Sequence, residues 1–119
     1  ADVLLHALCD SMLGAAGLRD IGYYFSNKDS RWKNISSLVL LAECLKLIRK
    51  HKLKVGNIDI TLILEEPKIS PYIDQMKKNI AKTLGIRSSQ ISIKSTTAEG
   101  LGFIGKKQGC SAYSICLLK

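Results

Sequence analysis

Residues 57–65 read N-I-D-I-T-L-I-L-E, and apolar side chains stand at every second position of this stretch. A period of two is typical of a β-strand with one buried face, because successive side chains of a strand point to opposite faces. Ile63 adds an apolar side chain on the other face, so we expect partial cover there as well. The segment predicts a half-buried strand whose inward positions are Ile58, Ile60, Leu62 and Leu64.

Two amphipathic helices are expected before this strand. Apolar residues recur every three or four positions in residues 2–16 and again in residues 36–52, which is the pattern of helices that each bury one face. Asp2 is the expected N-cap of the first helix, which ends at Gly17. Residues 18–35 have no sustained period. The expected core positions of the two helices are Leu5, Leu8, Met12, Ala15, Leu38, Leu41, Cys44, Leu45 and Ile48.

A helix and two strands are expected after this strand. Ser70 and Pro71 supply an N-cap and a proline at the first helical position, and the apolar period then runs to Gly85. Residues 90–97 alternate again, and residues 110–118 predict a last strand after a glycine-rich loop. This order of elements indicates an α/β sandwich with one mixed sheet and helices packed on one face, in a single domain over residues 1–119.

The chain carries 18 basic and 10 acidic residues, for a net charge of +8. Such an excess favours an anionic partner, either a nucleic acid or a phosphorylated small molecule, and does not choose between them. The longest apolar run is much shorter than the roughly 20 residues of a membrane-spanning helix, so no membrane partner is expected. The four cysteines lie in apolar patterns without C-x-x-C spacing, which predicts reduced core thiols in a reducing compartment.

One face of the first helix carries a candidate metal ligand. Asp2, His6 and Asp10 recur every four residues and therefore project from the same side. An imidazole flanked by carboxylates suits a metal, with the carboxylates in support. A packed histidine that hydrogen-bonds a carboxylate is the alternative, and it is the commoner case for such spacing. Because an open catalytic zinc site needs three protein ligands, His6 alone does not complete one.

A second candidate site follows the strand over residues 90–97. Residues 94–99 place hydroxyls, backbone amides and the Glu99 carboxylate at the strand end, where they suit phosphate oxygens and a divalent cation. A polar turn capped by threonines is the alternative, and composition alone favours it. The glycines at 100, 102 and 105 match a dinucleotide-binding fingerprint, but the run stands between two strands with no helix after it, so we reject that reading.

Together these segments resemble the 2-C-methyl-D-erythritol 2,4-cyclodiphosphate synthase family. The strongest matches are D-V-L-L-H-A-L-C-D at residues 2–10 and K-S-T-T-A-E-G-L-G-F at residues 94–103, and residues 13–16, 20–22, 56–59 and 67–68 match in the family's order. The resemblance implies a lyase that converts 4-diphosphocytidyl-2-C-methyl-D-erythritol 2-phosphate to 2-C-methyl-D-erythritol 2,4-cyclodiphosphate with release of CMP, in non-mevalonate isoprenoid biosynthesis. It also implies a homotrimer with active sites between subunits, in the bacterial cytoplasm or, if a transit segment preceded it, the plastid stroma.

Carried over residue by residue, the resemblance implies zinc at His6, support from Asp10, and magnesium or manganese at Glu99. Thr97 and Lys68 would be the catalytic donors. Lys106 stands where arginine is familiar, and Ser26-Asn27 replaces a proline and an acidic residue. The implied substrate-binding residues are Asp20, Ile21, Gly22, Phe25, Ser26, Asn27, Lys28, Asp29, Leu64, Glu65, Glu66, Pro67, Lys68, Ile69, Ser70, Thr96, Thr97, Ala98, Glu99, Phe103 and Lys106.

The family's H-G-x-D-x-H strand, which donates the aspartate and second histidine of the zinc site, is not in this sequence, and we expect it upstream of residue 1. Two other functions stay open. One is a basic nucleic-acid-binding α/β module, which the net charge alone favours, and the other is a trimeric fragment without activity. Against the first, Tyr23, Tyr24 and Trp32 lie in the irregular stretch rather than between lysines on a strand, so no nucleic-acid partner is expected.

Overall fold

The strand predicted over residues 57–65 forms as β1 (Val55–Ile63), so the predicted inward residue Leu64 lies beyond its end. It is the middle strand of a three-stranded sheet with the order β2-β1-β3. In this computed structural model, which describes residues 2–65, 70–106 and 109–119, β2 (Ile91–Thr96) runs parallel to β1. The last strand, β3 (Ser111–Leu118), runs antiparallel to β1 on its other edge. The expected mixed sheet is therefore confirmed.

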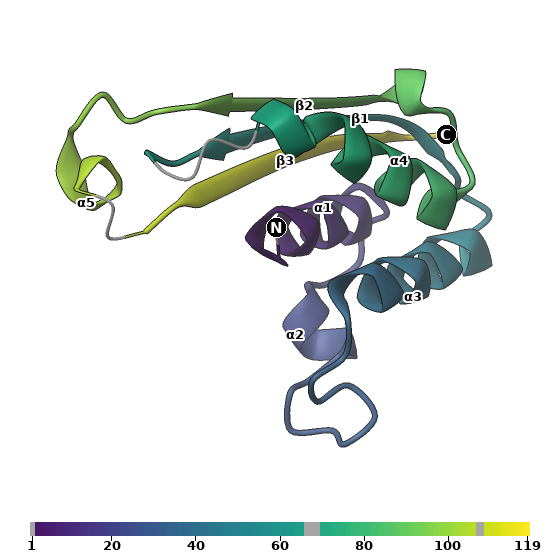
Figure 1. Ribbon diagram of the computed structural model, residues 1–119. Coiled ribbons are helices and arrows are strands. Elements are labelled where there is room, and N and C mark those ends of the chain that lie inside the picture. Colours follow the sequence, from purple (N-terminus) through teal and green to yellow (C-terminus); the bar gives the residue numbers. More distant parts are fainter. Residues whose placement is uncertain (1, 66–69, 107–108) are drawn as a thin grey trace.

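Three helices lie on one side of this sheet (Figure 1): α1 (Asp2–Ala15), α3 (Ser37–Lys50) and α4 (Ile73–Leu84). Helix α1 is the central one, because it contacts β1 and β3 as well as α3. Two short helices, α2 (Ile21–Tyr24) and α5 (Gly102–Gly105), lie at separate ends of the molecule. No helix in the described ranges has both the length and the hydropathy needed to cross a bilayer.

The core forms where the buried stripes of the helices meet the inward side chains of the sheet. Ile58, Ile60 and Leu62 of β1 are buried, as the alternation predicts, while Asp59 and Thr61 between them are only half-buried. Ala15 was expected in the core but is exposed, because it lies off the buried stripe of α1. That stripe consists of Leu4, Leu5, Leu8, Cys9, Met12 and Leu13.

Several predicted boundaries are wrong in detail. Ser70 and Pro71 do not begin the third long helix, because Ser70–Tyr72 forms a 3₁₀ turn and α4 starts at Ile73. Such turns are frequent at the N-termini of α-helices. Asp2 is the first helical residue rather than a cap. The end at Gly85 is confirmed, because this residue has a left-handed φ of 67° and donates its N–H to the Ala81 carbonyl.

The glycine-rich loop also holds a helix that the sequence did not predict. Helix α5 is a single turn in which the Gly105 N–H donates to the Leu101 carbonyl at 3.0 Å. A Cβ at Gly105 would overlap the backbone of Gly100, so only glycine permits this close approach. The turn closes the loop on itself, and it is far shorter than the helix of a dinucleotide-binding unit.

The four cysteines are free thiols, as expected, but they differ in burial. Cys9 and Cys44 are buried together, and the pKa of Cys44 is raised by its hydrogen bond with Cys9 and by burial. Burial raises the pKa of Cys116 to about 11. The prediction of a core thiol is wrong for Cys110, which is exposed because it precedes the first residue of β3.

Two glycines are expected to respond in opposite directions to alanine. Gly14→Ala should raise the free energy of unfolding by about 0.5–1 kcal/mol, because alanine is the better helix residue and its Cβ would meet no atom within 4 Å. Gly85→Ala should lower it by about 1–2 kcal/mol, since an L side chain is strained in the left-handed region. Urea unfolding of both variants tests this, and a change of the same sign in both would contradict it.

Candidate functional site

A cavity of about 750 Å³ lies between the start of α1 and the segment that joins α1 to α3. His6 of α1 is exposed and belongs to its wall. The apolar residues of α1 turn to the core, so the polar side of the helix is left for the cavity. The wall consists of Asp2, His6, Ile21, Gly22, Phe25, Ser26, Asn27, Lys28, Trp32, Lys33, Asn34, Ile35, Ser37 and Leu40. The structure thus brings seven of the predicted site residues together.

Two carboxylates that were predicted in the site hold α2 in place. Asp10 of α1 accepts a hydrogen bond from the Ile21 N–H at 3.0 Å. Asp20 is the N-cap of α2 and accepts from the Tyr23 N–H at 3.1 Å. Because a capping side chain satisfies a backbone donor that the helix leaves free, these bonds fix where Gly22 enters the cavity wall.

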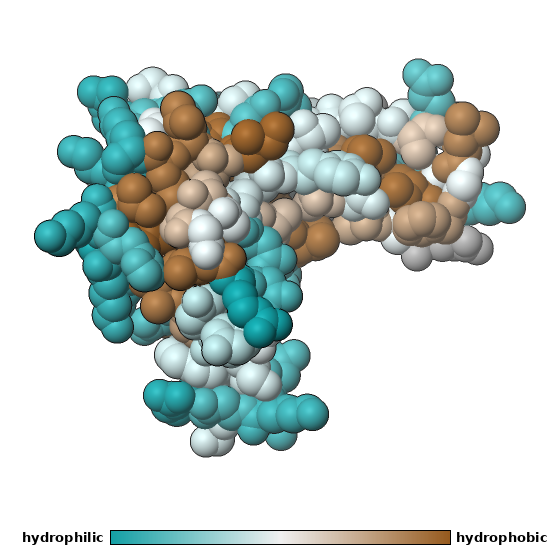
Figure 2. All heavy atoms as spheres, turned by 180° about the vertical axis from the view of Figure 1, so that it is seen from behind, coloured by the Kyte–Doolittle hydropathy of each residue, from teal (hydrophilic) through white to brown (hydrophobic). Residues whose placement is uncertain are grey.

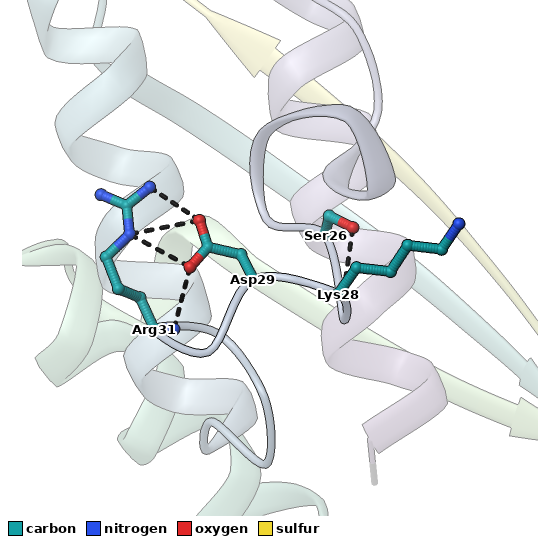
Figure 3. A network of polar contacts seen from close by, with 4 residues as sticks. All are labelled: Ser26, Lys28, Asp29 and Arg31. Atoms are coloured by element: carbon teal, nitrogen blue, oxygen red, sulfur yellow. Dashed lines mark hydrogen bonds and ion pairs between the residues drawn. The ribbon is translucent and has the colours of Figure 1, made fainter.

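The loop after α2 has its own polar contacts (Figure 3). The Ser26 hydroxyl accepts from the Lys28 N–H at 3.2 Å. Asp29 accepts from the Arg31 backbone N–H at 3.0 Å and from its guanidinium Nη2 at 2.8 Å. The Arg31 hydrogen bonds hold the pKa of Asp29 below its usual value. The carboxylate of Asp29 is therefore engaged within its own loop, beside the cavity wall rather than in it.

Trp32 is a cavity residue that the sequence analysis did not assign to the site. Its ring packs edge-to-face against Phe25, with centroids 4.9 Å apart. Its indole N–H is buried and has no acceptor among the described residues. Buried donors without a partner are rare in folded proteins, so this N–H is an exception that marks the cavity wall as unusual. The single tryptophan of the chain, inside an otherwise polar loop, was the available signal.

The second predicted group forms a turn at the carboxyl end of β2. The Glu65 carboxylate accepts from the Ala98 N–H at 2.8 Å and from the Gly100 N–H at 3.3 Å. The Thr97 hydroxyl accepts from the Glu99 N–H at 3.1 Å, and Glu99 has a left-handed φ of 54°. Glu65 therefore supports the turn from inside, while Thr96, Thr97 and Glu99 are exposed on it.

These two groups lie apart in one chain. The cavity lies beside α2, whereas the turn lies at the other end, beside α5 (Figure 1). Leu64 lies next to the turn and not next to the cavity, because its N–H donates to the Thr96 carbonyl at 3.0 Å. Phe103 and Lys106 are exposed in and just after α5, and Ser70 begins the 3₁₀ turn. The predicted residues Glu66, Pro67, Lys68 and Ile69 lie outside the described residues.

The described residues of one chain do not form a metal site by themselves. Within residues 2–65, 70–106 and 109–119, no three histidine, cysteine or acidic side chains converge as a metal site. Asp2 shares the cavity with His6, but its carboxylate accepts from the Ser37 hydroxyl at 2.8 Å. The described residues of one chain thus offer His6 in the cavity and Glu99 on the distant turn. Neither place reaches the three protein ligands of an open zinc site.

Comparison with known proteins identifies the family. The YgbB family matches residues 1–119. The 2-C-methyl-D-erythritol 2,4-cyclodiphosphate synthase of Syntrophomonas wolfei is 50% identical over 119 residues, which are 100% of this chain and 76% of that protein. The synthase of Clostridium acetobutylicum is 55% identical over 118 residues, which cover 99% of this chain and 76% of that one.

Solved structures agree with the sequence comparison. The bifunctional IspDF from Campylobacter jejuni has a TM-score of 0.94 and 41% identity, covering 98% of this chain and 32% of that chain. A CDP complex of IspF from Plasmodium falciparum has a TM-score of 0.85 and 39% identity, covering 98% of this chain and 69% of that chain. The chain therefore belongs to the YgbB family, the family of the 2-C-methyl-D-erythritol 2,4-cyclodiphosphate synthases.

Proposed function

We propose that the chain closes 2-C-methyl-D-erythritol 2,4-cyclodiphosphate from its CDP-linked precursor with release of CMP, as a homotrimer whose active sites lie between subunits. This activity is that of its family, whose members are lyases of non-mevalonate isoprenoid biosynthesis. The observation that carries the assembly is that the Thr96–Glu99 turn lies beside α5, apart from α2 (Figure 1), whose residues line the His6 cavity. A cavity of one subunit facing the turn of a neighbour would unite them. Because the curated relatives compared above are bacterial, we place the reaction in the bacterial cytoplasm.

The open face of the sheet is the surface we propose for contact between subunits. Tyr113, Ile115 and Leu117 of β3 point away from the helices and are 63%, 73% and 65% exposed. These three side chains follow one another at every second position of the strand, so they form one apolar row. Figure 2 shows further apolar side chains on the molecule seen from behind, with hydrophilic ones along its left edge. Contiguous exposed apolar surface of this kind is typical of subunit interfaces. A second and a third copy of the chain are the proposed occupants, since closed rings are the common way to bury one such surface in every subunit.

The substrate is proposed to lie across the boundary. The cavity of about 750 Å³ falls within the range of pockets for small molecules. Asp20 and Gly22 would hold the ribose, and the Lys28 ammonium would attract phosphate oxygens. Thr97 of the neighbour would donate its hydroxyl to the diphosphate, so that donors already in place offset the charge that shifts to the leaving CMP. Lys68 is proposed to add a cation from outside the described residues.

The family uses a divalent metal, and we propose one ligand for each of two ions. His6 would supply an imidazole nitrogen to zinc, with Asp10 behind it, and Glu99 would supply a carboxylate to magnesium or manganese. The remaining donors would come from outside the described residues of one chain. A bound divalent ion supplies polarisation of phosphate oxygens. The described residues would position the substrate, form the cavity wall and supply fixed hydrogen-bond donors.

Mixing two inactive variants tests both the reaction and its location. His6→Ala removes the cavity half of the site and Glu99→Gln removes the turn half. Each variant alone should release almost no CMP from the CDP-linked substrate with divalent ion present. After the two are unfolded and refolded together in equal amounts, random trimers should regain about a quarter of wild-type activity, because that share of the interfaces joins two intact halves.

The outcomes separate the parts of the proposal. No recovery in mixed trimers would contradict a shared site, because it would mean that both residues act within one subunit. No CMP from the folded, metal-loaded wild-type protein that carries the H-G-x-D-x-H strand expected upstream of residue 1 would overturn the proposed reaction. CMP release by that protein but not by residues 1–119 alone would identify these residues as the inactive fragment. A monomer in sedimentation equilibrium would contradict the trimer directly.

Glu65 is expected to affect catalysis although it faces into the turn. Glu65→Ala removes the acceptor of the Ala98 and Gly100 N–H groups, so Thr97 loses its fixed position. We expect kcat for CMP release to fall by about 10- to 100-fold, the usual cost of misplacing a reacting group by about 1 Å. Glu43→Ala is the matched control, since the one partner of Glu43 within the described ranges is the exposed Lys46. Equal activity of both variants would contradict this role.

A further inference from the structure

A second hollow lies at the opposite end of the molecule from the Thr96–Glu99 turn. It has a volume of about 510 Å³ and lies where α3 and α4 both end. Four basic residues line it, each from a different segment: Arg49, Lys54, Arg87 and Lys119. No aspartate or glutamate side chain belongs to its wall among the residues that the structure describes. Hydrophilic side chains fringe this end of the molecule, at the left edge of Figure 2.

The two lysines are held next to each other by the backbone. Lys54 and Lys119 exchange two N–H to carbonyl hydrogen bonds, both 2.9 Å long. Like charges in directly opposed positions of paired strands destabilise the pair. Gly56 lets the Lys119 stem lie on the sheet, because even a Cβ there would be only 3.7 Å from the Lys119 Cδ and Cε atoms. The sheet therefore holds two lysines in opposed backbone positions that electrostatic repulsion disfavours.

The two arginines are also placed by neighbouring structure. The Arg49 guanidinium lies beside Gly85, where an added Cβ would stand 4.0 Å from its Nη2 atom. The backbone of Arg87 is tied to β1 through Gln90, whose side-chain oxygen accepts the Arg87 N–H at 2.9 Å. The Gln90 amide in turn donates to the Gly56 carbonyl at 2.8 Å. The arginine loop and the lysine pair thus share one anchor.

The charge of this hollow is not balanced within the described chain. The ion pairs among the described residues join Arg31 to Asp29, Lys46 to Glu43 and Lys94 to Asp59, and none involves the four cations. The C-terminal ends of α3 and α4 contribute about half a negative charge each, or about one in total. The four basic side chains therefore outweigh the negative ends of the two helices around one small volume.

We propose that this hollow binds a multiply charged phosphate anion of the diphosphate class. Two guanidinium groups can each hold two phosphate oxygens in a fork, and the lysines add compact point charges. Free diphosphate and the diphosphate of a nucleotide share this chemistry. The cations surround one hollow instead of forming a stripe along a helix, which favours a small anion over a nucleic-acid strand. The site shares no residue with the His6 cavity or the turn, so it stands apart from the proposed reaction.

Titration of the chain with inorganic diphosphate tests the site. The backbone amide resonances of Gly85, Ile86 and Arg87 should shift on addition of diphosphate. The double variant Arg49→Gln, Arg87→Gln should raise the dissociation constant read from these shifts by about tenfold or more. The reason is that both guanidinium groups lose their charged hydrogen bonds to the phosphate oxygens. The control is Lys78→Gln combined with Lys82→Gln, which removes the same charge from exposed positions of α4 outside the hollow.

Each result decides the matter. An equal loss of affinity in both double variants, or shifts confined to the cavity around His6, would overturn the proposal. CDP that shifts the same amides and binds more tightly than diphosphate would support it and name a nucleotide as the source, whereas weaker CDP binding would support the free anion. A single-stranded RNA that binds more tightly than either, and loses no more affinity in the arginine variant than in the lysine control, would overturn it in favour of a general basic surface.

Discussion

His6→Ala is expected to lower kcat for CMP release by at least about 100-fold. Loss of a residue that merely supports a metal ligand lowers metal affinity or activity by about 10- to 100-fold. Loss of the proposed ligand itself should therefore lower activity by at least as much. His6 is the one imidazole in the cavity wall, and no other described side chain there can replace it as a nitrogen ligand. The measurement is steady-state CMP release with saturating substrate and divalent ion, together with the zinc content of the purified protein.

His51→Ala is the matched control, because it removes the other histidine of the chain from an exposed position after α3. Its CMP release should stay near the wild-type rate. Both variants should keep the free energy of unfolding within about 0.5 kcal/mol of wild type, as is usual for exposed positions. Wild-type activity of His6→Ala with normal folding would contradict the site, and an equal loss in His51→Ala would show that the effect is not specific.

Leu8→Ala is expected to have the largest effect on stability, a loss of about 3–5 kcal/mol in the free energy of unfolding. Leu8 is 0% exposed in the middle of α1, and α1 is the helix that joins the sheet to α3. The smaller side chain leaves a cavity that the surrounding elements cannot all close. Because small domains are stable by only about 5–15 kcal/mol, this variant should unfold at a clearly lower urea concentration.

The control for Leu8 is Leu101→Ala, the same substitution at a side chain that is 72% exposed. It should change stability by no more than about 0.5 kcal/mol. Unfolding should be measured at one fixed protein concentration, since assembly would stabilise both chains by mass action. Similar losses in the two variants would contradict the central place of α1 in the core.

The long elements of this fold were predictable because their signals are local. The alternation in β1 and the helical periods of α1 and α3 each depend on residues a few positions apart. Helix α2 was not predictable in the same way, since its first N–H is bound by Asp10, a side chain from the preceding helix. The 3₁₀ turn at Ser70–Tyr72 was missed because its sequence also suits the start of an α-helix.

The candidate site was predictable only in part, for a similar reason. The exposed hydroxyls and carboxylate after β2 follow from the strand end, which the alternation locates. The inward position of Glu65 does not, because its partners are the Ala98 and Gly100 amides more than 30 residues away. The unpaired indole N–H of Trp32 also depends on packing, here against Phe25 and the cavity wall. Periodicity contains no information about such contacts.

The parallel pairing of β1 and β2 has a consequence for how this family can vary in length. Ile63 of β1 stands opposite Thr96 of β2, so the segment with Glu65 and the segment with Thr97 leave the sheet at the same edge. Insertion of one residue within β2 would send every later side chain to the other face of the sheet, and the carboxylate of Glu65 would no longer meet the amides it binds. A residue gained or lost within β2 is therefore expected to disturb the turn that Glu65 supports, whereas the exposed loop around Lys28 can change its length without altering a strand.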